Sequence, residues 1–164
     1  YSTYKKISNI INHGSRKRKN YKLIGLNARM DTLQSVLLLK KFKQLKKNIK
    51  YKIKIAKTYN KFFNDHNLFG KPLIKKNFQS VYSQYTICVK KRNLLKNILS
   101  KNKIPYKVYY SKPIYKELAY KQNIYLKNTE FVAKHSISLP LEEKTSKKLL
   151  IIFKKLIQKD IFFK

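Results

Sequence analysis

The longest regular pattern of apolar and polar positions covers residues 31–63. Apolar side chains recur there at steps of three and four residues, which places on one helix face Leu38, Phe42, Leu45, Ile49, Ile53, Ala56, Tyr59 and Phe63. Asp31 and Gln34 have the spacing of a capping box, so the helix is predicted to begin there. Lysines fill the opposite face, and we therefore expect one long helix whose apolar stripe belongs to a core.

A strand is predicted over residues 80–89, where apolar and polar side chains alternate. Its apolar face would carry Val81, Tyr85, Ile87 and Val89. Weaker patterns predict a helix ending at His13–Gly14, a helix capped by Asn93, a short strand over 107–110 and a last helix capped by Thr145. We expect the residues after Lys159 to fray.

The charge of the chain is strongly positive, at +33 over 164 residues. Such a charge would suggest an anionic partner such as nucleic acid. However, arginine occurs only at Arg16, Arg18, Arg29 and Arg92, and the remaining basic residues are lysines that accompany many Asn, Ile, Tyr and Phe residues. These amino acids have the codons richest in A and T, so a biased genome explains the composition, and a nucleic-acid partner is disfavoured.

Metal and membrane chemistry have little support in the sequence. Cys88 is the single cysteine, which excludes an internal disulfide and a cysteine-rich zinc site, and the three histidines are well separated, so we expect no metal. No apolar run approaches the roughly 20 residues of a membrane helix. No hydrophobic signal core opens the chain, which predicts a cytoplasmic protein without a membrane partner.

Residues 25–42, GLNARMDTLQSVLLLKKF, combine recognition chemistry with a helix start. The Asn27 amide can donate to a phosphate, and the Arg29 guanidinium can bind a carboxylate with two parallel hydrogen bonds; both precede the favourable end of a helix dipole. This stretch resembles the G-x-N-x-R-x-D-x-x-Q segment of the DegT/DnrJ/EryC1/StrS family of pyridoxal-phosphate aminotransferases, which act on nucleotide-linked keto sugars. Further similar segments are Asn12–Ser15, SVYSQYTICV from Ser80, residues 101–115 and residues 130–141.

The resemblance implies an α+β fold, namely the C-terminal small domain of a fold-type I aminotransferase, with a long connecting helix and a small, mainly antiparallel sheet flanked by helices. It implies three segments: residues 1–30 as the tail of the large cofactor-binding domain with a basic loop at Ser15–Lys22, residues 31–64 as the connecting helix, and residues 65–164 as the small domain. The chain begins at Tyr1 rather than methionine, and the resemblance favours a portion of a longer protein.

The resemblance also implies the chemistry. In the family a lysine forms a Schiff base with pyridoxal 5'-phosphate, and an amino group passes from glutamate to the nucleotide sugar. That lysine is expected outside this chain, so no catalytic residue is assigned and the chain alone is expected to be inactive. Asn27 would contact the cofactor phosphate of the other subunit in a homodimer, Arg29 the substrate, and Tyr109 and Tyr110 would line the sugar pocket.

The strand SVYSQYTI resembles the branch that aminates UDP-linked 3-keto hexuronates, commonly for O-antigen or other surface polysaccharides. Tyr109 stands where that branch commonly has histidine, and a tyrosine can only hydrogen-bond to a sugar carboxylate. Two alternatives stay open. The chain could be an inactive remnant of an aminotransferase, or a basic nucleic-acid-binding module, for which lysines and tyrosines interleave in residues 106–125.

Overall fold

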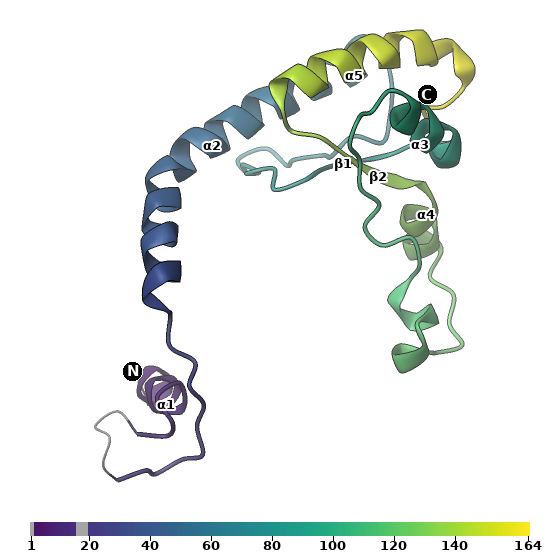
Figure 1. The fold of residues 1–164 in the computed structure, drawn as a ribbon. Helices are drawn as coiled ribbons and strands as arrows, with labels where there is room; N and C mark the ends of the chain where they lie inside the picture. The colour runs from purple at the N-terminus through teal and green to yellow at the C-terminus, as the bar shows by residue number, and fades with distance from the viewer. Residues whose placement is uncertain (1, 16–19) are drawn as a thin grey trace. The chain divides into compact units, whose positions relative to one another are not determined.

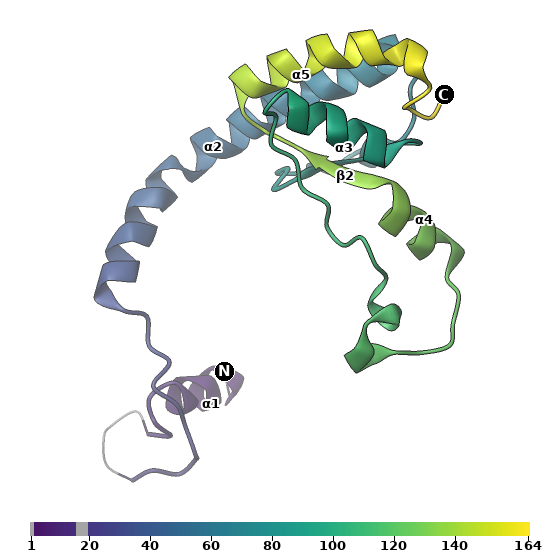
Figure 2. The ribbon, with the colours of Figure 1, turned by 45° about the vertical axis from the view of Figure 1, so that its right-hand side comes forward.

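The structure is a computed structural model that describes residues 2–15 and 20–164. The chain divides into two compact units, residues 1–46 and 47–164. Each unit is described by itself, and Figures 1 and 2 show the ribbon from two sides. Within the predicted basic loop Ser15–Lys22, residues 16–19 lie outside the described residues.

The first unit contains helix α1 (Ser2–Ile10) and the loop that leads to α2. The chain leaves α1 through His13 and Gly14, whose φ angles of 61° and 87° are left-handed, as expected for a helix that ends at a glycine. The Asn12 side chain donates to the Ser8 carbonyl at 2.8 Å, which satisfies one of the carbonyls at the end of the helix. The predicted helix end is therefore confirmed within a few residues.

Helix α2 (Thr32–Asp65) begins in the first unit and continues into the second. Its start is fixed by Asp31, whose carboxylate oxygen accepts the Leu33 N–H at 2.8 Å. The predicted long helix is confirmed, but the prediction that its whole apolar stripe lies in a core is wrong. Phe42 is 66% exposed, whereas Tyr59 and Phe63 are fully buried. Periodicity identifies the helix face but not how far along the helix a partner covers it.

The second unit is built around a two-stranded antiparallel sheet, β1 (Tyr85–Cys88) and β2 (Ser136–Leu139). The register pairs Tyr85 with Leu139 and Cys88 with Ser136. Around this sheet lie α3 (Arg92–Lys101), α4 (Lys127–His135) and α5 (Glu143–Leu156), with short 3-10 turns η1 (Ile114–Lys116), η2 (Leu118–Tyr120) and η3 (Ile157–Lys159). The predicted α+β fold with a small antiparallel sheet is confirmed.

The core of the second unit lies between the sheet and the C-terminal half of α2. Helix α5 runs beside that half of α2 in both views (Figures 1 and 2), and the rings of Phe62 and Phe153 lie 5.9 Å apart. The Tyr59 hydroxyl donates to the Pro140 carbonyl at 2.7 Å and so ties α2 to the chain after β2. Among the described residues the fully buried large side chains are Tyr59, Tyr85, Phe63, Phe153, Phe162, Ile87, Leu95, Leu99, Ile137, Leu149, Ile161 and Val89.

The strand predicted over residues 80–89 is shorter than expected. Pairing is confined to β1, because Tyr82 has a φ of 46° and interrupts the extended backbone. Tyr82 is consequently buried, with its ring 5.9 Å from that of Tyr85, while Val81 is 53% exposed. The prediction that Val81 lies on the apolar, buried face is therefore wrong, and Tyr82 is buried in its place.

Three other predicted boundaries are corrected. The strand expected over 107–110 is a single antiparallel bridge between Lys107 and Ser138. Helix α3 begins at Arg92, so Asn93 lies inside the helix and is not its cap. Helix α5 begins at Glu143 with Glu142 at the cap position, and Thr145 instead donates its hydroxyl to the Glu142 carboxylate.

The expectation that residues after Lys159 fray is wrong. Ile161 and Phe162 are buried, and the Ile161 carbonyl accepts the N–H of Lys90 at 2.8 Å. Asp160 takes a left-handed conformation and pairs with Lys90 at 2.7 Å, which turns the chain back onto the core. Burial of Ile161 and Phe162 in the core therefore holds this segment in place.

None of the helices within residues 2–15 and 20–164 has the length and apolar character needed to cross a bilayer.

Candidate functional site

Two motif segments of the first unit pair with each other. Asn12 and Asn27 form an antiparallel bridge, and the Leu26 N–H donates to the Ile10 carbonyl at 2.7 Å. The His13 N–H in turn donates to the Leu26 carbonyl at 3.0 Å. Sequence reasoning singled out both segments but not their pairing, because a bridge between two irregular segments leaves no periodic pattern.

A glycine at position 25 is required by this pairing. A Cβ atom on Gly25 would lie 2.1 Å from the Gly14 nitrogen and 2.5 Å from the His13 carbonyl carbon. Backbone atoms cannot move aside as a flexible side chain can, so only glycine allows the approach. The glycines of the two motifs therefore fix the backbone immediately before Asn27.

Asn27 and Arg29 both present exposed side chains. Within residues 2–15 and 20–164, the hydrogen bonds and ion pairs include none made by the Asn27 amide group or the Arg29 guanidinium. The backbone of Asn27 is nevertheless held by its bridge to Asn12, and Asp31 fixes the helix start that follows. The two side chains thus combine an ordered backbone with unused hydrogen-bonding capacity, which is what a ligand-binding group needs.

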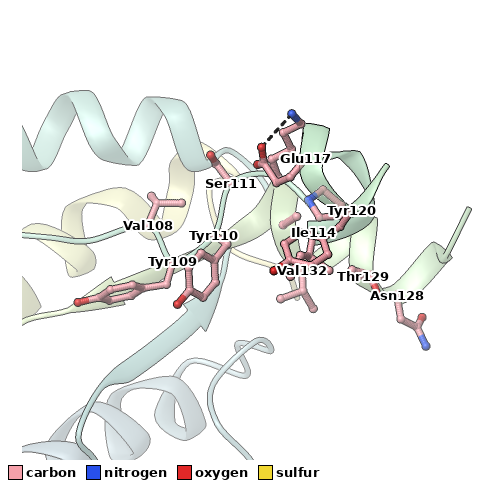
Figure 3. Close-up of a pocket in the computed structure, with 13 residues that line it drawn as sticks. Val108, Tyr109, Tyr110, Ser111, Ile114, Glu117, Tyr120, Asn128, Thr129 and Val132 are labelled. Atoms are coloured by element: carbon pink, nitrogen blue, oxygen red, sulfur yellow. Dashed lines mark hydrogen bonds and ion pairs between the residues drawn. The ribbon is translucent and has the colours of Figure 1, made fainter. Parts of the chain in front are cut away.

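The second unit contains a cavity of about 910 Å³, shown in Figure 3. Three segments form its walls: Val108–Pro113, the turns η1 and η2, and helix α4. Tyr109 and Tyr110 lie in the first of these, with their rings edge to face at 6.3 Å. Tyr110 is 81% exposed and Tyr109 is 40% exposed, so both rings can be covered by a ligand.

A smaller cavity of about 450 Å³ lies beside the first, and Tyr109 lines both. Its polar lining comes from Lys52, Lys107, Glu142, Ser83, Gln84 and Ser138. The predicted pocket residues Tyr109 and Tyr110 therefore line the larger cavity together, and Tyr109 lines the smaller one as well. Asn27 and Arg29 belong to the first unit and these tyrosines to the second.

Tyr115 and Glu130 interact next to the large cavity. The Tyr115 hydroxyl donates to the Glu130 carboxylate at 2.7 Å and accepts the Leu126 N–H at 3.3 Å, while Lys116 forms an ion pair with the same carboxylate. Hydrogen bonds from Lys116 and from Tyr115 hold the pKa of Glu130 below its ordinary value, and burial followed by the bond to Glu130 raises the pKa of Tyr115.

No periodic pattern or spacing in the sequence pointed to the hydroxyl chemistry of Tyr115. Tyr115 is 5% exposed, and a buried tyrosine hydroxyl needs a partner. Glu130 is the only acidic residue between Glu117 and Glu142 in the sequence. Because acidic residues are so scarce in this chain, Glu130 could have been singled out as a partner for the Tyr115 hydroxyl.

Solved structures define the class of this fold. Over 94% of its length the chain is similar to a DegT DnrJ EryC1 StrS aminotransferase from Brucella abortus, with a TM-score of 0.84 and 27% identity. Over 96% of its length it is similar to Helicobacter pylori PseC, an aminotransferase involved in the biosynthesis of pseudoaminic acid, with a TM-score of 0.81 and 26% identity. The chain covers 43% and 47% of these two chains, respectively.

The DegT/DnrJ/EryC1/StrS aminotransferase family model matches residues 2–152, and the chain belongs to this family. The chain is 33% identical over 113 residues to a UDP-2-acetamido-2-deoxy-3-oxo-D-glucuronate aminotransferase of Pseudomonas aeruginosa. That match covers 69% of this chain and 31% of the relative, so the chain spans about a third of the curated protein that it resembles.

Family membership confirms pyridoxal 5'-phosphate as the cofactor. The first unit offers chemistry that fits the phosphate of this cofactor: an exposed, unpaired amide donor on Asn27, held on a glycine-fixed backbone ahead of a helix start. An amide donor and the positive end of a helix both favour a phosphate oxygen.

Proposed function

We propose that this chain is the C-terminal portion of an aminotransferase that moves an amino group from glutamate to a nucleotide-linked keto sugar. The observation that carries the proposal is the presentation of Asn27 and Arg29, which are exposed, unpaired among the described residues and placed just before the Asp31 cap of α2. Side chains that are exposed and without a partner in the described fold are available to a ligand, and their position suits two anionic groups. The enzyme would act as a cytoplasmic homodimer in surface polysaccharide synthesis.

Each proposed role follows from the chemistry of the side chain. The Asn27 amide would donate to the cofactor phosphate held by the other subunit. The Arg29 guanidinium would bind a substrate carboxylate with two parallel hydrogen bonds, which a lysine cannot reproduce. The bound cofactor supplies the electron sink for amino transfer. The lysine that holds the cofactor is proposed to lie in a part of the enzyme outside this chain.

Tyr109 and Tyr110 would bind the sugar within the large cavity. Their exposed ring faces can pack against the apolar face of a sugar ring, and their hydroxyls can hydrogen-bond to its oxygens. The name of the Pseudomonas aeruginosa relative points to a UDP-linked 3-keto hexuronate as substrate. Arg29 supports this choice because a hexuronate carries a carboxylate.

Binding of a stable analogue tests the sugar pocket. We expect UDP-glucuronic acid to perturb the amide resonances of residues lining the large cavity, and Tyr110→Ala to weaken binding about 10-fold because a stacking ring is lost. Tyr106→Phe is the matched control, since Tyr106 lines only the smaller cavity. Perturbations spread over the lysine face of α2, reproduced equally by free phosphate, would refute the proposed pocket.

Treatment with the cofactor tests the proposed division of the active site. The chain incubated with pyridoxal 5'-phosphate and then reduced with borohydride should carry only scattered, substoichiometric adducts on surface lysines. A single lysine labelled to one equivalent would contradict the proposal that the cofactor lysine lies elsewhere. Reading the coding sequence upstream of Tyr1 for an in-frame segment with that lysine separates the enzyme from an inactive remnant.

A nucleic-acid-binding function is the second candidate. Tyr110, Tyr120 and Tyr125 are 81%, 61% and 73% exposed and lie among lysines, an arrangement on which single-stranded bases can stack. Sequence-independent binding of a single-stranded oligonucleotide, with an affinity that falls steeply as salt rises, would favour this candidate. Loss of all binding at physiological salt would remove it.

A further inference from the structure

The Tyr115 side chain joins three segments of the second unit. Its hydroxyl donates to Glu130 in α4 at 2.7 Å and accepts the N–H of Leu126, which precedes α4, at 3.3 Å. Its own carbonyl accepts the Gln122 N–H at 3.0 Å, which closes the chain after η2 back onto η1. One buried residue thus connects η1, the chain from Gln122 to Leu126, and α4.

The same segments carry two walls of the large cavity. Ile114, Glu117 and Tyr120 line it from the side of η1 and η2, and Thr129 and Val132 line it from α4, as Figure 3 shows. Tyr115 and Glu130 are not among the lining residues. They hold the two walls together from outside the cavity and do not touch its contents.

The hydrogen bonds of Tyr115 are the main restraint on the cavity wall formed by η1 and η2, because this wall makes few apolar contacts. Leu118 is 90% exposed, Tyr120 61% and Tyr125 73%, so the segment from η2 to α4 buries little surface. A segment of this kind opens at low free-energy cost unless specific bonds restrain it. Tyr115 and the buried Pro113 are the points at which the segment from Ser111 to Tyr125 enters the interior.

We propose that Tyr115 and Glu130 form a latch that sets the width of the large cavity and thereby its affinity for the nucleotide sugar. The ligand in this inference rests on the proposed function, whereas the restraint on the wall does not. Tyr115 and Glu130 are positioning residues, because they act through Ile114, Tyr120 and α4. Lys116, which pairs with Glu130, keeps the carboxylate charged and in place.

Two variants separate the hydrogen bond from the charge. Tyr115→Phe keeps the buried ring but removes the hydroxyl that bonds to Glu130 and Leu126. Glu130→Gln keeps an oxygen that can accept the Tyr115 hydroxyl but removes the charge that pairs with Lys116. Tyr106→Phe is the matched control, since its hydroxyl lies 3.2 Å from the Ser100 hydroxyl and the residue does not line the large cavity.

Amide hydrogen exchange in the ligand-free chain tests the restraint itself. We expect Tyr115→Phe to speed exchange at Gln122 and Leu126 about 10-fold or more, with β1 and β2 unchanged. We expect Glu130→Gln to have a smaller effect and Tyr106→Phe to have none at these amides. Unchanged exchange at Gln122 and Leu126 in Tyr115→Phe would overturn the latch whether or not the cavity binds a sugar.

Affinity for UDP-glucuronic acid then tests the consequence for binding. We expect Tyr115→Phe to weaken binding about fivefold, Glu130→Gln to stay within about twofold of the unchanged chain, and Tyr106→Phe to match it. Faster exchange with unchanged affinity would overturn the positioning role. A chain that does not bind the probe at all would refute the proposed sugar pocket and the ligand-positioning role, while exchange alone would decide the restraint.

Discussion

The two halves of α2 share one sequence pattern but differ in burial. In the half that belongs to the second unit, Ile55, Ala56, Tyr59, Phe62 and Phe63 are buried against the sheet and α5. In the half that belongs to the first unit, the apolar side chains Leu33, Val36, Leu37, Leu38, Leu39, Phe42 and Leu45 are all exposed, by 44% to 74%. The same helix therefore combines a segment stabilised by tertiary packing with one stabilised by local interactions.

This difference separates two sources of helix stability. Packing of an apolar face contributes most of the stability of helices in proteins, whereas an isolated helical segment depends on propensity, capping and side-chain pairs. In the N-terminal half of α2 the described local support includes the Asp31 cap and the Ser35 hydroxyl, which donates to the Asp31 carbonyl at 2.9 Å. The two halves should consequently respond to different mutations.

The largest expected effect compares two phenylalanines of α2. Phe63→Ala removes a fully buried ring and should lower the free energy of unfolding by roughly 3–5 kcal/mol. Phe42→Ala removes a ring that is 66% exposed and should change it by less than about 0.5 kcal/mol. Chemical denaturation measures both. Equal losses that grow with protein concentration would show that a second copy covers the N-terminal half in solution.

The C-terminal residues provide the next comparison. Phe162 is 2% exposed and lies edge to face with Phe153 and Phe63, at 5.0 and 5.9 Å between ring centres. Phe162→Ala should therefore cost about 3 kcal/mol of unfolding free energy. Phe163→Ala, at a half-buried neighbour, should cost about 1 kcal/mol. Indistinguishable stability of Phe162→Ala and the unchanged chain would mean that the end of the chain frays after all.

Removal of the α2 cap should affect only the N-terminal half. Asp31→Ala deletes the acceptor of the Leu33 N–H, a loss of about 1 kcal/mol in local helix stability. The expected result is faster amide exchange in the first turns of α2 and a smaller helical circular dichroism signal, with the unfolding midpoint of the second unit unchanged. Asp31→Asn, which keeps an acceptor oxygen, should behave like the unchanged chain; a shifted midpoint in Asp31→Ala would contradict the separation of the two halves.

The smallest expected effect is the pH dependence of the latch. Because its partners lower the pKa of Glu130, this carboxylate stabilises the folded chain above its unfolded pKa of about 4.3. This stabilisation decreases as the pH falls below about 4.3, and it is lost once the pH has fallen through the lower pKa of Glu130 in the folded chain. The stability difference between the unchanged chain and Glu130→Gln should thus be constant from pH 7 to about 5 and shrink below about 4.3. A difference that grows on acidification would refute this assignment.

Much of the candidate site could be identified in the sequence, because its residues fall in motifs with fixed spacing. Asn27, Arg29 and Asp31 lie at every second position just before a strongly periodic helix. The structure shows that the helix starts after Asp31 and that the Asn27 and Arg29 side chains are exposed. Their roles in binding stay predictions. Tyr109 and Tyr110 line one cavity together, and their proposed contact with a sugar likewise stays a prediction.

Other features could not be predicted, because they depend on pairings between separate segments or on a single unusual backbone angle. The Tyr115–Glu130 bond joins residues whose spacing matches neither a helix nor a strand period. The Asn12–Asn27 bridge joins two irregular loops, and the burial of Tyr82 follows from a left-handed backbone angle that no alternation indicates.

By itself, the sequence determined the periods of the main helices, the capping of α2 by Asp31 and the membership of an aminotransferase family, because each is encoded in side chains that are close along the chain. Only the tertiary structure decided which half of α2 is buried, where β1 begins, that Phe162 completes the core, and that Tyr115 and Glu130 hold the cavity wall. Burial depends on what packs against a segment. Phe162 packs against Phe63 although it lies far from it in the sequence, whereas Phe42, on the same helix, stays exposed.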